Sequence, residues 1–199
     1  MRKQPPPPPL TEAETSEAEQ ELGVSLPPEY RDYLREVSAG GALARLERTD
    51  RGWWWAGNDE AMRARLVVPF PHPDSYDEGR RRVGRAGAAG RGVRGRGGVR
   101  RRMACLGRRG RRVRGHKTAG AVVVQEHGCG FSTLLAVTGP LAGTVWWDGR
   151  ATCDRIVPLS PDHLGGARPV RFAEWLRHGS WALLPPDWPP HPSTPVVPR

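Results

Sequence analysis

Hydrophobic residues recur at helical spacing near the start of the chain. Ala18 and Leu22 lie one turn apart and define an apolar face. Thr11 and Glu14 have the three-residue spacing of a capping box, in which each side chain bonds the other residue's backbone amide. Gly23 is typical of the residue that follows a helix. This pattern predicts a first helix between Thr11 and Gly23.

A second helix is predicted to begin at Leu26-Pro27-Pro28, because proline is tolerated in a first helical turn, where its missing amide has no partner. Gly40-Gly41 stops the pattern. Between these limits the apolar residues fall at i, i+3, i+4 and i+7, which predicts one buried stripe. The stripe consists of Tyr30, Tyr33, Leu34 and Val37.

Shorter elements are expected after these helices. The period-2 alternation over 42–48 predicts a strand, and Trp53-Trp54-Trp55 predicts a second strand beyond the turn at Gly52. Residues 58–65 have the pattern of a helical turn. The apolar run 66–70 predicts another short strand, which Pro71 and Pro73 end.

Strand patterns return in close order between residues 121 and 159. The predicted strands cover 121–124, 131–138, 144–147 and 155–159, and residues 139–143 form a hairpin-type connection with glycines that tolerate positive φ. A closing helix is predicted from Val170 or Arg171. Its buried face is expected to hold Phe172, Trp175, Leu176 and Gly179.

The order of these elements favours an α+β fold. Two helices come first, the strands follow, and one helix closes the chain, whereas an alternating βαβ pattern is absent from the sequence. We therefore expect two N-terminal helices, a central and mostly antiparallel sheet, and a C-terminal helix. The expected single domain covers residues 10–184, between Pro-rich disordered tails at 1–9 and 185–199.

An Arg/Gly-rich segment, Gly79–Gly115, interrupts this pattern and dominates the charge. It holds 15 Arg and no acidic residue, although the whole chain has 31 basic and 21 acidic residues and a net charge of +10. The rest of the chain thus has 16 basic and 21 acidic residues, a net charge of −5. We interpret the segment as a disordered insert outside the folded core, so the basic charge is not a property of the domain.

The sequence gives no sign of a membrane or secreted protein. No apolar run approaches the roughly 18–20 residues that span a bilayer, and the N-terminus has no apolar signal-peptide region. Three cysteines, Cys105, Cys129 and Cys153, form no disulfide framework, which fits a reducing compartment. We expect a cytoplasmic protein without a membrane partner; the sequence leaves the oligomeric state open.

The flanks of the insert resemble the SUKH superfamily, the Smi/Knr-like domains. The run from Leu22 to Leu34 with Gly40-Gly41 resembles the opening signature, and Gly128–Phe131, the strand 134–139 and Gly143–Trp147 resemble the paired strands. Phe172–Leu176 resembles the closing helix. The resemblance covers roughly residues 10–78 and 117–184. Its structural signature residues are Leu26, Pro27, Tyr30, Leu34, Gly139, Gly143, Trp147, Phe172 and Trp175.

The resemblance implies an α+β fold and a binding role without catalysis. Many bacterial members are regarded as immunity proteins that neutralise a polymorphic toxin, often a nuclease or deaminase, and others are intracellular scaffolds or regulatory modules. A mildly acidic domain fits an inhibitor of a basic, nucleic-acid-cleaving toxin. We expect an immunity protein with a protein partner and no cofactor; the alternative is a scaffold or regulatory module without a toxin.

The insert departs from the family pattern, and two interpretations stay open beside a simple disordered insertion. It could be an RNA-binding segment, but it lacks interleaved Phe or Tyr, and 15 Arg would contact nucleic acid nonspecifically. The other is a frame-shifted segment of a GC-rich gene. Codons such as GAC-GAG-GCC contain, in another frame, CGA-GGC, which encodes Arg-Gly. The transitions after Glu78 and near His116-Lys117 are abrupt.

Few residues suggest chemistry. His127 and Cys129 are two apart and could share a strand face as a nucleophile pair, but no nearby Asp or Asn is placed to orient the histidine. A zinc site formed by His127, Cys129 and Cys153 lacks the usual ligand spacing. Asp148 suits a hairpin turn better than a catalytic role. We therefore expect no catalytic residue and no metal site.

Tryptophans are the candidate partner-binding residues. Neighbours on a strand alternate sides, so at least one of Trp53-Trp54-Trp55 and one of Trp146-Trp147 must face away from the core. An outward tryptophan is either covered by other parts of the chain or anchors a partner. The candidates for the second role are Trp53, Trp54 and Trp146.

The frame-shift interpretation makes a direct prediction. Resequencing the gene across the codons for residues 76–118 is expected to reveal two compensating shifts, which restore an ordinary, acid-richer segment between the two flanks. An unbroken frame with the same Arg and Gly codons contradicts the interpretation and leaves a genuine insertion.

Overall fold

The computed structural model describes residues 5–75, 116–152, 154–163, 168–186 and 188. The predicted insert Gly79–Gly115, Cys105, Cys153 and most of the predicted C-terminal tail lie outside these residues. The helices and strands are α1 Glu12–Leu22, α2 Pro28–Glu36, β1 Leu46–Thr49, β2 Gly52–Trp55, the 3₁₀ helix η1 Glu60–Arg65, β3 Ala121–Gly128, β4 Phe131–Ala136, β5 Val145–Asp148, β6 Ile156–Pro158, α5 Phe172–His178 and the 3₁₀ helix η2 Trp181–Leu183.

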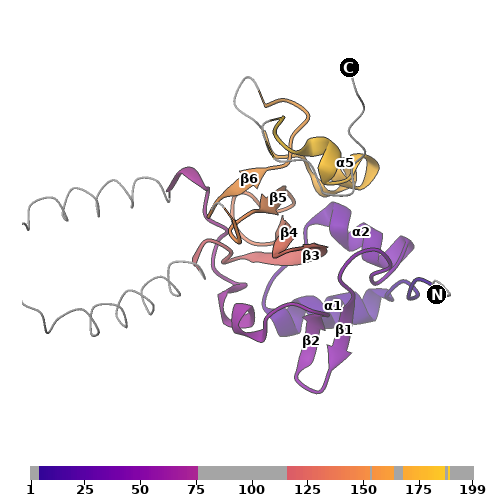
Figure 1. Ribbon diagram of the computed structural model, residues 1–199. Helices are drawn as coiled ribbons and strands as arrows, with labels where there is room; N and C mark the ends of the chain where they lie inside the picture. Colours follow the sequence, from indigo (N-terminus) through magenta and orange to yellow (C-terminus); the bar gives the residue numbers. More distant parts are fainter. Residues whose placement is uncertain (1–4, 76–115, 153, 164–167, 187, 189–199) are drawn as a thin grey trace, which may run out of the picture.

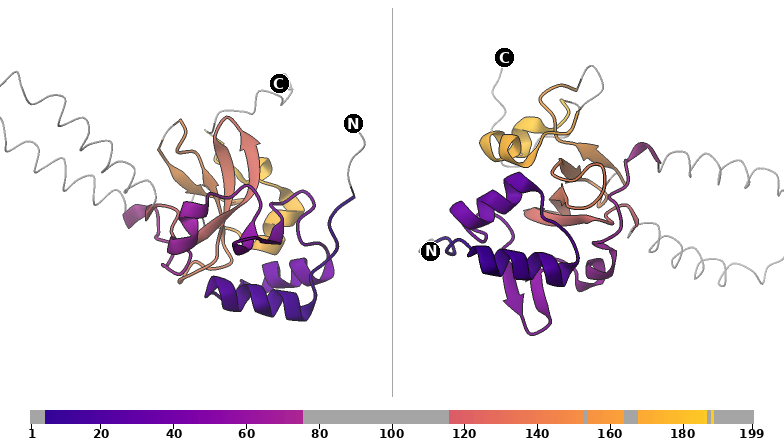
Figure 2. Two further views of the ribbon diagram at one scale, coloured as in Figure 1. Left: turned by 90° about the horizontal axis from the view of Figure 1, so that it is seen from below. Right: turned by 180° about the vertical axis from the view of Figure 1, so that it is seen from behind.

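The fold is α+β, as the order of patterns predicted. Strands β3, β4, β5 and β6 form a four-stranded antiparallel sheet in that order, and β1 and β2 form a separate antiparallel hairpin. Helices α1, α2 and α5 lie on the same side of the four-stranded sheet, and the β1–β2 hairpin projects beside α1 (Figures 1 and 2). The four-stranded sheet confirms the predicted antiparallel sheet, and strands β1 and β2 form a hairpin of their own.

Local sequence signals set the ends of α1. The Thr11 hydroxyl accepts a hydrogen bond from the Glu14 amide at 3.2 Å, and the Thr11 amide donates to the Glu14 carboxylate at 2.8 Å. This reciprocal pair is the predicted capping box, and it satisfies two amides that the helix leaves unpaired. Gly23 follows the helix with φ +69°, a conformation that glycine adopts without steric cost.

One hydrophobic core joins the two flanks of the insert. Its members come from α1 and α2, from the β1–β2 hairpin, from one face of the sheet and from α5. Burial of apolar surface stabilises the fold by about 25 cal/mol per Å². Because residues before 76 and after 115 pack in the same cluster, each flank needs the other to bury its apolar side chains. Fully buried members include Leu34, Leu46, Val122, Leu135, Val145 and Leu159.

Tyr30 is the polar point inside this core. Its side chain is fully buried, and its hydroxyl accepts a hydrogen bond from Trp55 Nε1 at 2.7 Å. Its ring meets the ring of Phe172 on α5 edge to face, with centroids 5.0 Å apart. Burial raises the pKa of Tyr30, which therefore stays protonated. One residue of α2 thus connects the hairpin on one flank with the closing helix on the other.

A smaller core lies on the opposite face of the sheet. It joins Leu134, Trp146 and Ile156 with Phe70, whose ring centroid is 5.4 Å from that of Trp146. The segment that carries Phe70 was predicted as a strand over 66–70, and this prediction is wrong. The chain turns at residues 66–68, where the Val68 amide bonds the Arg65 carbonyl, and Pro69 has no amide to donate to a ladder.

Two other predictions need correction. The strand predicted over 42–48 begins only at Leu46, because residues 41–43 form a turn and the Ala44 amide bonds the Val124 carbonyl of the other sheet. The apolar stripes also extend too far. Val37 is 60% exposed and Leu176 is 42% exposed, because α2 ends at Glu36 and the buried face of α5 is supplied by Phe172 and Trp175.

Residues 5–9, the described part of the predicted Pro-rich tail, make hydrogen bonds to the end of α2 and the segment after it. The Ala39 amide donates to the Pro8 carbonyl at 3.1 Å, and the Ser38 hydroxyl donates to the Pro7 carbonyl at 2.7 Å. The Leu10 amide then donates to the Leu34 carbonyl at 2.8 Å. These bonds hold the proline segment along the end of α2, since proline carbonyls accept hydrogen bonds although proline amides cannot donate them.

Replacing Tyr30 with Phe is expected to lower the free energy of unfolding by about 1–3 kcal/mol, because the buried Trp55 indole then loses its acceptor. Urea unfolding followed by tryptophan fluorescence measures the change. Tyr33→Phe is the matched control: that hydroxyl bonds the Gly40 carbonyl from a half-buried position, where water can replace it. An equal or smaller loss for Tyr30→Phe contradicts the role assigned to this bond.

Candidate functional site

The signature residues that the sequence singled out lie in the interior or at tight turns. Tyr30 and Leu34 face the core from α2, Trp147 from β5, and Phe172 and Trp175 from α5. Leu26 is 3% exposed, and Pro27 is also buried. None of these side chains is available at the surface, so their positions account for folding and leave the binding surface to other residues.

Two signature glycines occupy positions that exclude larger residues. Gly139 has φ +95°, and a Cβ there would lie 2.7 Å from Cβ of Pro69. Gly143 has φ +86°, and a Cβ there would lie 3.1 Å from Nη1 of Arg171. Both positive φ and close approach favour glycine, so these two residues shape the connection between β4 and β5.

The three candidate partner-binding tryptophans are buried. Trp53, Trp54 and Trp146 are 4%, 3% and 1% exposed. Their indole nitrogens donate within the chain: Trp53 to Glu17 at 3.2 Å, Trp54 to the Asn58 carbonyl at 3.1 Å, and Trp146 to Thr144 at 2.8 Å. The guanidinium of Arg63 also lies 4.7 Å above the Trp54 ring. Of the two alternatives, cover by other parts of the chain and anchoring of a partner, these three tryptophans show the first.

His127 and Cys129 lie at the β3–β4 turn but have different surroundings. The His127 Nε2 atom is 2.8 Å from the Thr133 hydroxyl, which is 2.6 Å from the Ser180 hydroxyl. Ser180 is 2% exposed and also accepts a hydrogen bond from Trp175 Nε1 at 2.8 Å. The Cys129 thiol is exposed. This chain of hydroxyls ties the hairpin to the segment after α5 and ends in a buried serine.

The residues that the structure describes form no candidate metal site. They contain no group of three His, Cys, Asp or Glu side chains that could hold a metal ion, and Cys153 lies outside them. Asp148 ends β5 and is 6% exposed. Its carboxylate accepts from the Arg150 guanidinium at 2.8 and 2.6 Å, so it serves as a paired turn residue.

The surface feature with a clear chemical character is the outer side of α1 and α2. Residues 11–37 contain eight carboxylates and two arginines. We call this region the acidic helix pair. The two helices pack against the four-stranded sheet through the core, and they lie at the side of the molecule where the N-terminus is drawn (Figure 1). A surface of one sign attracts partners of the opposite sign and speeds their association.

Several of these carboxylates already have structural partners. Glu12 pairs with Arg31 and, at 2.8 Å, with Arg35; Glu19 pairs with Arg31 at 3.2 Å. The hydrogen bond from Arg31 lowers the pKa of Glu12, and the hydrogen bond from the Thr11 amide lowers the pKa of Glu14. These carboxylates hold α1 against α2 and cap α1. They add to the negative electrostatic potential of the surface, but their oxygens are already engaged within the chain.

Other acids of the pair support neighbouring elements. Glu21 accepts a hydrogen bond from the Trp53 amide at 2.8 Å, and Glu29 accepts from the Ala173 amide at 2.8 Å. Glu17 pairs with Arg48 on β1. Each carboxylate closes an otherwise unpaired backbone or cationic group on a different element.

Asp32 and Glu36 remain as exposed carboxylates, one helical turn apart on α2, without an ion pair among the described residues. They are not among the candidate binding residues predicted from the sequence. The signal was available, because they lie on the opposite side of the helix from Tyr30 and Leu34, which the apolar stripe identified. Together they are the exposed carboxylates of the acidic helix pair that no ion pair in the described ranges engages.

Comparison with known proteins agrees with the resemblance. Residues 9–80 match the sequence model of the SMI1 / KNR4 family (SUKH-1). This range includes α1, α2, the β1–β2 hairpin and η1. Neither a curated protein nor a solved structure matches the chain. None of the helices in the described ranges has the length and apolar character needed to cross a membrane.

The acidic helix pair predicts a pH dependence of stability. The pKa values of Glu12 and Glu14 are lower in the folded chain than their ordinary value of 4.5, so the unfolded chain binds protons more readily. Their contribution is present above pH 4.5 and is lost as the pH falls through the lower folded values. The free energy of unfolding, measured in urea at several pH values, is expected to decline below pH 4.5.

Glu12→Gln should make that decline shallower and lower stability at pH 7, because the pairs with Arg31 and Arg35 are lost. Asp50→Asn is the control, since Asp50 lies in the β1–β2 turn and has no ion pair within the part of the chain that the structure describes. Parallel declines for wild type and Glu12→Gln contradict this account.

Proposed function

We propose that this chain, which belongs to the SUKH superfamily, is a non-enzymatic protein-binding domain and acts as an immunity protein that neutralises a toxin. The observation that carries the proposal is the acidic helix pair, with eight carboxylates against two arginines over residues 11–37. Asp32 and Glu36 present part of this charge to solvent without an internal counter-ion among the described residues.

The charge suggests the class of toxin. A nuclease or nucleic-acid deaminase binds phosphates with Lys and Arg, so its active-site region is basic. An acidic protein surface competes for that region by offering carboxylates in place of phosphates, and complementary charge also speeds the encounter. The proposed mechanism is therefore occlusion of a basic toxin surface, without a chemical step on the immunity protein.

The hydroxyl chain at the β3–β4 turn supports a non-enzymatic role. A serine nucleophile must reach its substrate and needs a base that is itself oriented. Ser180 is 2% exposed, and its hydroxyl bonds both Thr133 and the Trp175 indole. This arrangement suits a structural link better than a reaction centre.

A cytoplasmic location follows from the proposal, because an immunity protein protects the cell that makes the toxin. The alternative function is an intracellular scaffold or regulatory module. The two differ in genetic context and in outcome: an immunity protein restores growth when it is co-expressed with a toxin encoded beside its own gene, and a scaffold does not.

Neutralising the free carboxylates tests the proposed surface. The double variant Asp32→Asn with Glu36→Gln is expected to reduce the rate of association with the adjacently encoded toxin by roughly tenfold at low salt, and by less as salt screens the charges. Surface plasmon resonance at several salt concentrations measures these rates.

Asp50→Asn, at the tip of the β1–β2 hairpin, is the control and should leave the rate nearly unchanged. Unaltered association of the double variant, with growth still restored, means that the toxin binds another surface. If the unmodified protein neither binds the toxin nor restores growth, the immunity role itself is contradicted.

A further inference from the structure

A rigid proline segment lies beside the acidic helix pair. Proline fixes φ near −65°, and a following proline favours extended backbone in the residue before it, so the run Pro5–Pro9 is extended and has little freedom to lose on binding. Its carbonyls are tied to Ser38 and Ala39 at 2.7 and 3.1 Å. The segment is thus preorganised and held in place.

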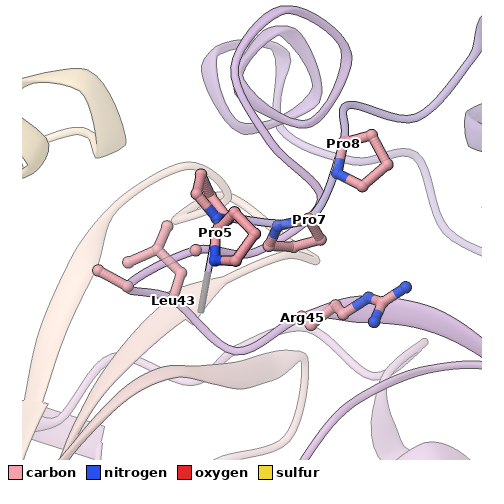
Figure 3. A pocket seen from close by; sticks show the side chains of 8 residues that line it. Pro5, Pro7, Pro8, Leu43 and Arg45 are labelled. Atoms are coloured by element: carbon pink, nitrogen blue, oxygen red, sulfur yellow. The ribbon is translucent and has the colours of Figure 1, made fainter. Parts of the chain in front are cut away.

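A hollow separates this segment from the turn that precedes β1. Its volume is about 770 Å³, within the range of about 300–1,000 Å³ typical of ligand sites. Leu43 lies below Pro5, and Arg45 lies farther along, beneath Pro7 and Pro8 (Figure 3). The lining residues are Pro5, Pro6, Pro7, Pro8, Gly41, Ala42, Leu43 and Arg45.

The lining is mostly apolar, with one cation. Proline rings and the Leu43 side chain offer flat apolar surface. The Arg45 guanidinium is 3.4 Å from Glu47, and their side chains are 53% and 36% exposed, so water weakens this pair. A guanidinium that is loosely held at the end of an apolar hollow can stack on an aromatic face.

The surroundings of the hollow indicate the rest of the partner surface. Val37 is 60% exposed and directly precedes Ser38, which holds the proline segment. Glu36 is its neighbour on α2, and Asp32 is one turn earlier. Protein interfaces commonly combine an apolar anchor site with a charged rim, and aromatic side chains are the commonest anchors.

We propose that the hollow between Pro5–Pro8 and Gly41–Arg45 receives one aromatic side chain of a basic partner protein. The ring packs on the prolines and Leu43, Arg45 stacks on its face, and basic residues beside it pair with Asp32 and Glu36. This inference rests on the proposed function and names its contact: the toxin carries an exposed aromatic residue among basic ones.

Filling the hollow tests the proposal with the intact protein. Ala42 lines it and is exposed, so Ala42→Trp should block it without disturbing the core. The dissociation constant for the toxin is expected to rise at least thirtyfold, the loss typical of a binding hot spot of about 2 kcal/mol. Ala61→Trp is the matched control, on exposed η1, and should bind like wild type.

A second measurement needs no toxin. The probe is the peptide Ac-Lys-Lys-Trp-Lys-Lys-amide at millimolar concentration, followed by ¹H–¹⁵N NMR. The ring current of its tryptophan should shift the amides of Gly41, Ala42 and Leu43 in wild type and in Ala61→Trp but not in Ala42→Trp. The peptide with Leu in place of Trp should shift them much less.

The outcomes separate the two proposals. Shifts confined to Asp32 and Glu36, or stronger binding of Ac-Glu-Glu-Trp-Glu-Glu-amide than of the basic probe, overturn the aromatic-and-basic partner. Wild-type toxin affinity in Ala42→Trp overturns the hollow as the contact, while the role of Asp32 and Glu36 stands. Probe binding in the hollow without any toxin binding supports the site and rejects the immunity role.

Discussion

The fold depends on the buried contact of Tyr30 with Trp55 and Phe172. The tyrosine hydroxyl accepts from the indole at 2.7 Å, and its ring meets Phe172 at 5.0 Å, so residues from both sides of segment 76–115 are joined in one core. To form such a core, residues before 76 and residues after 115 must come into contact during folding. The entropic cost of closing a loop grows only logarithmically with its length, by roughly 0.6 kcal/mol per doubling. The contact therefore explains how residues on the two sides of segment 76–115 build one core.

Most acidic residues of α1 also make contacts that hold elements of the fold together. Glu12 and Glu19 hold α2 through Arg31. Glu17 pairs with Arg48, and Glu21 accepts a hydrogen bond from the Trp53 amide of β2. A composition count treats all eight carboxylates of the helix pair alike, but most have structural partners. Removing one of the paired acids tests stability and binding together. Asp32 and Glu36 are different, because a change there alters the surface charge and leaves the described ion pairs of the core elements intact.

Much of this architecture was predictable where the local signal and the tertiary environment agree. Patterns of a few adjacent residues were enough to predict four features: the capping box at Thr11, the glycine after α1, the second helix and the meander from 121 to 158. The errors lie where a distant contact decides. Residues 66–70 are apolar like a strand, yet Phe70 is held by the Thr138 carbonyl and by Trp146. For Trp53, Trp54 and Trp146 the sequence left cover within the chain and partner binding both open, because alternation along a strand cannot reveal that Glu17, Asn58 and Thr144 bond their indoles.

The proposed binding surface was harder to predict because it is made from the ends of elements rather than their faces. A proline run read alone is an unfolded tail, and only the bonds from Ser38 and Ala39 turn it into one wall of a hollow. Val37 continues an apolar stripe in sequence, but α2 ends before it, so it lies 60% exposed beside that wall. An exposed apolar residue costs little stability when removed, whereas burying it in a complex gains free energy. The termination of α2 at Glu36 thus places an exposed apolar side chain and a carboxylate without an ion pair in the described ranges next to each other, the combination that the proposed basic partner would use.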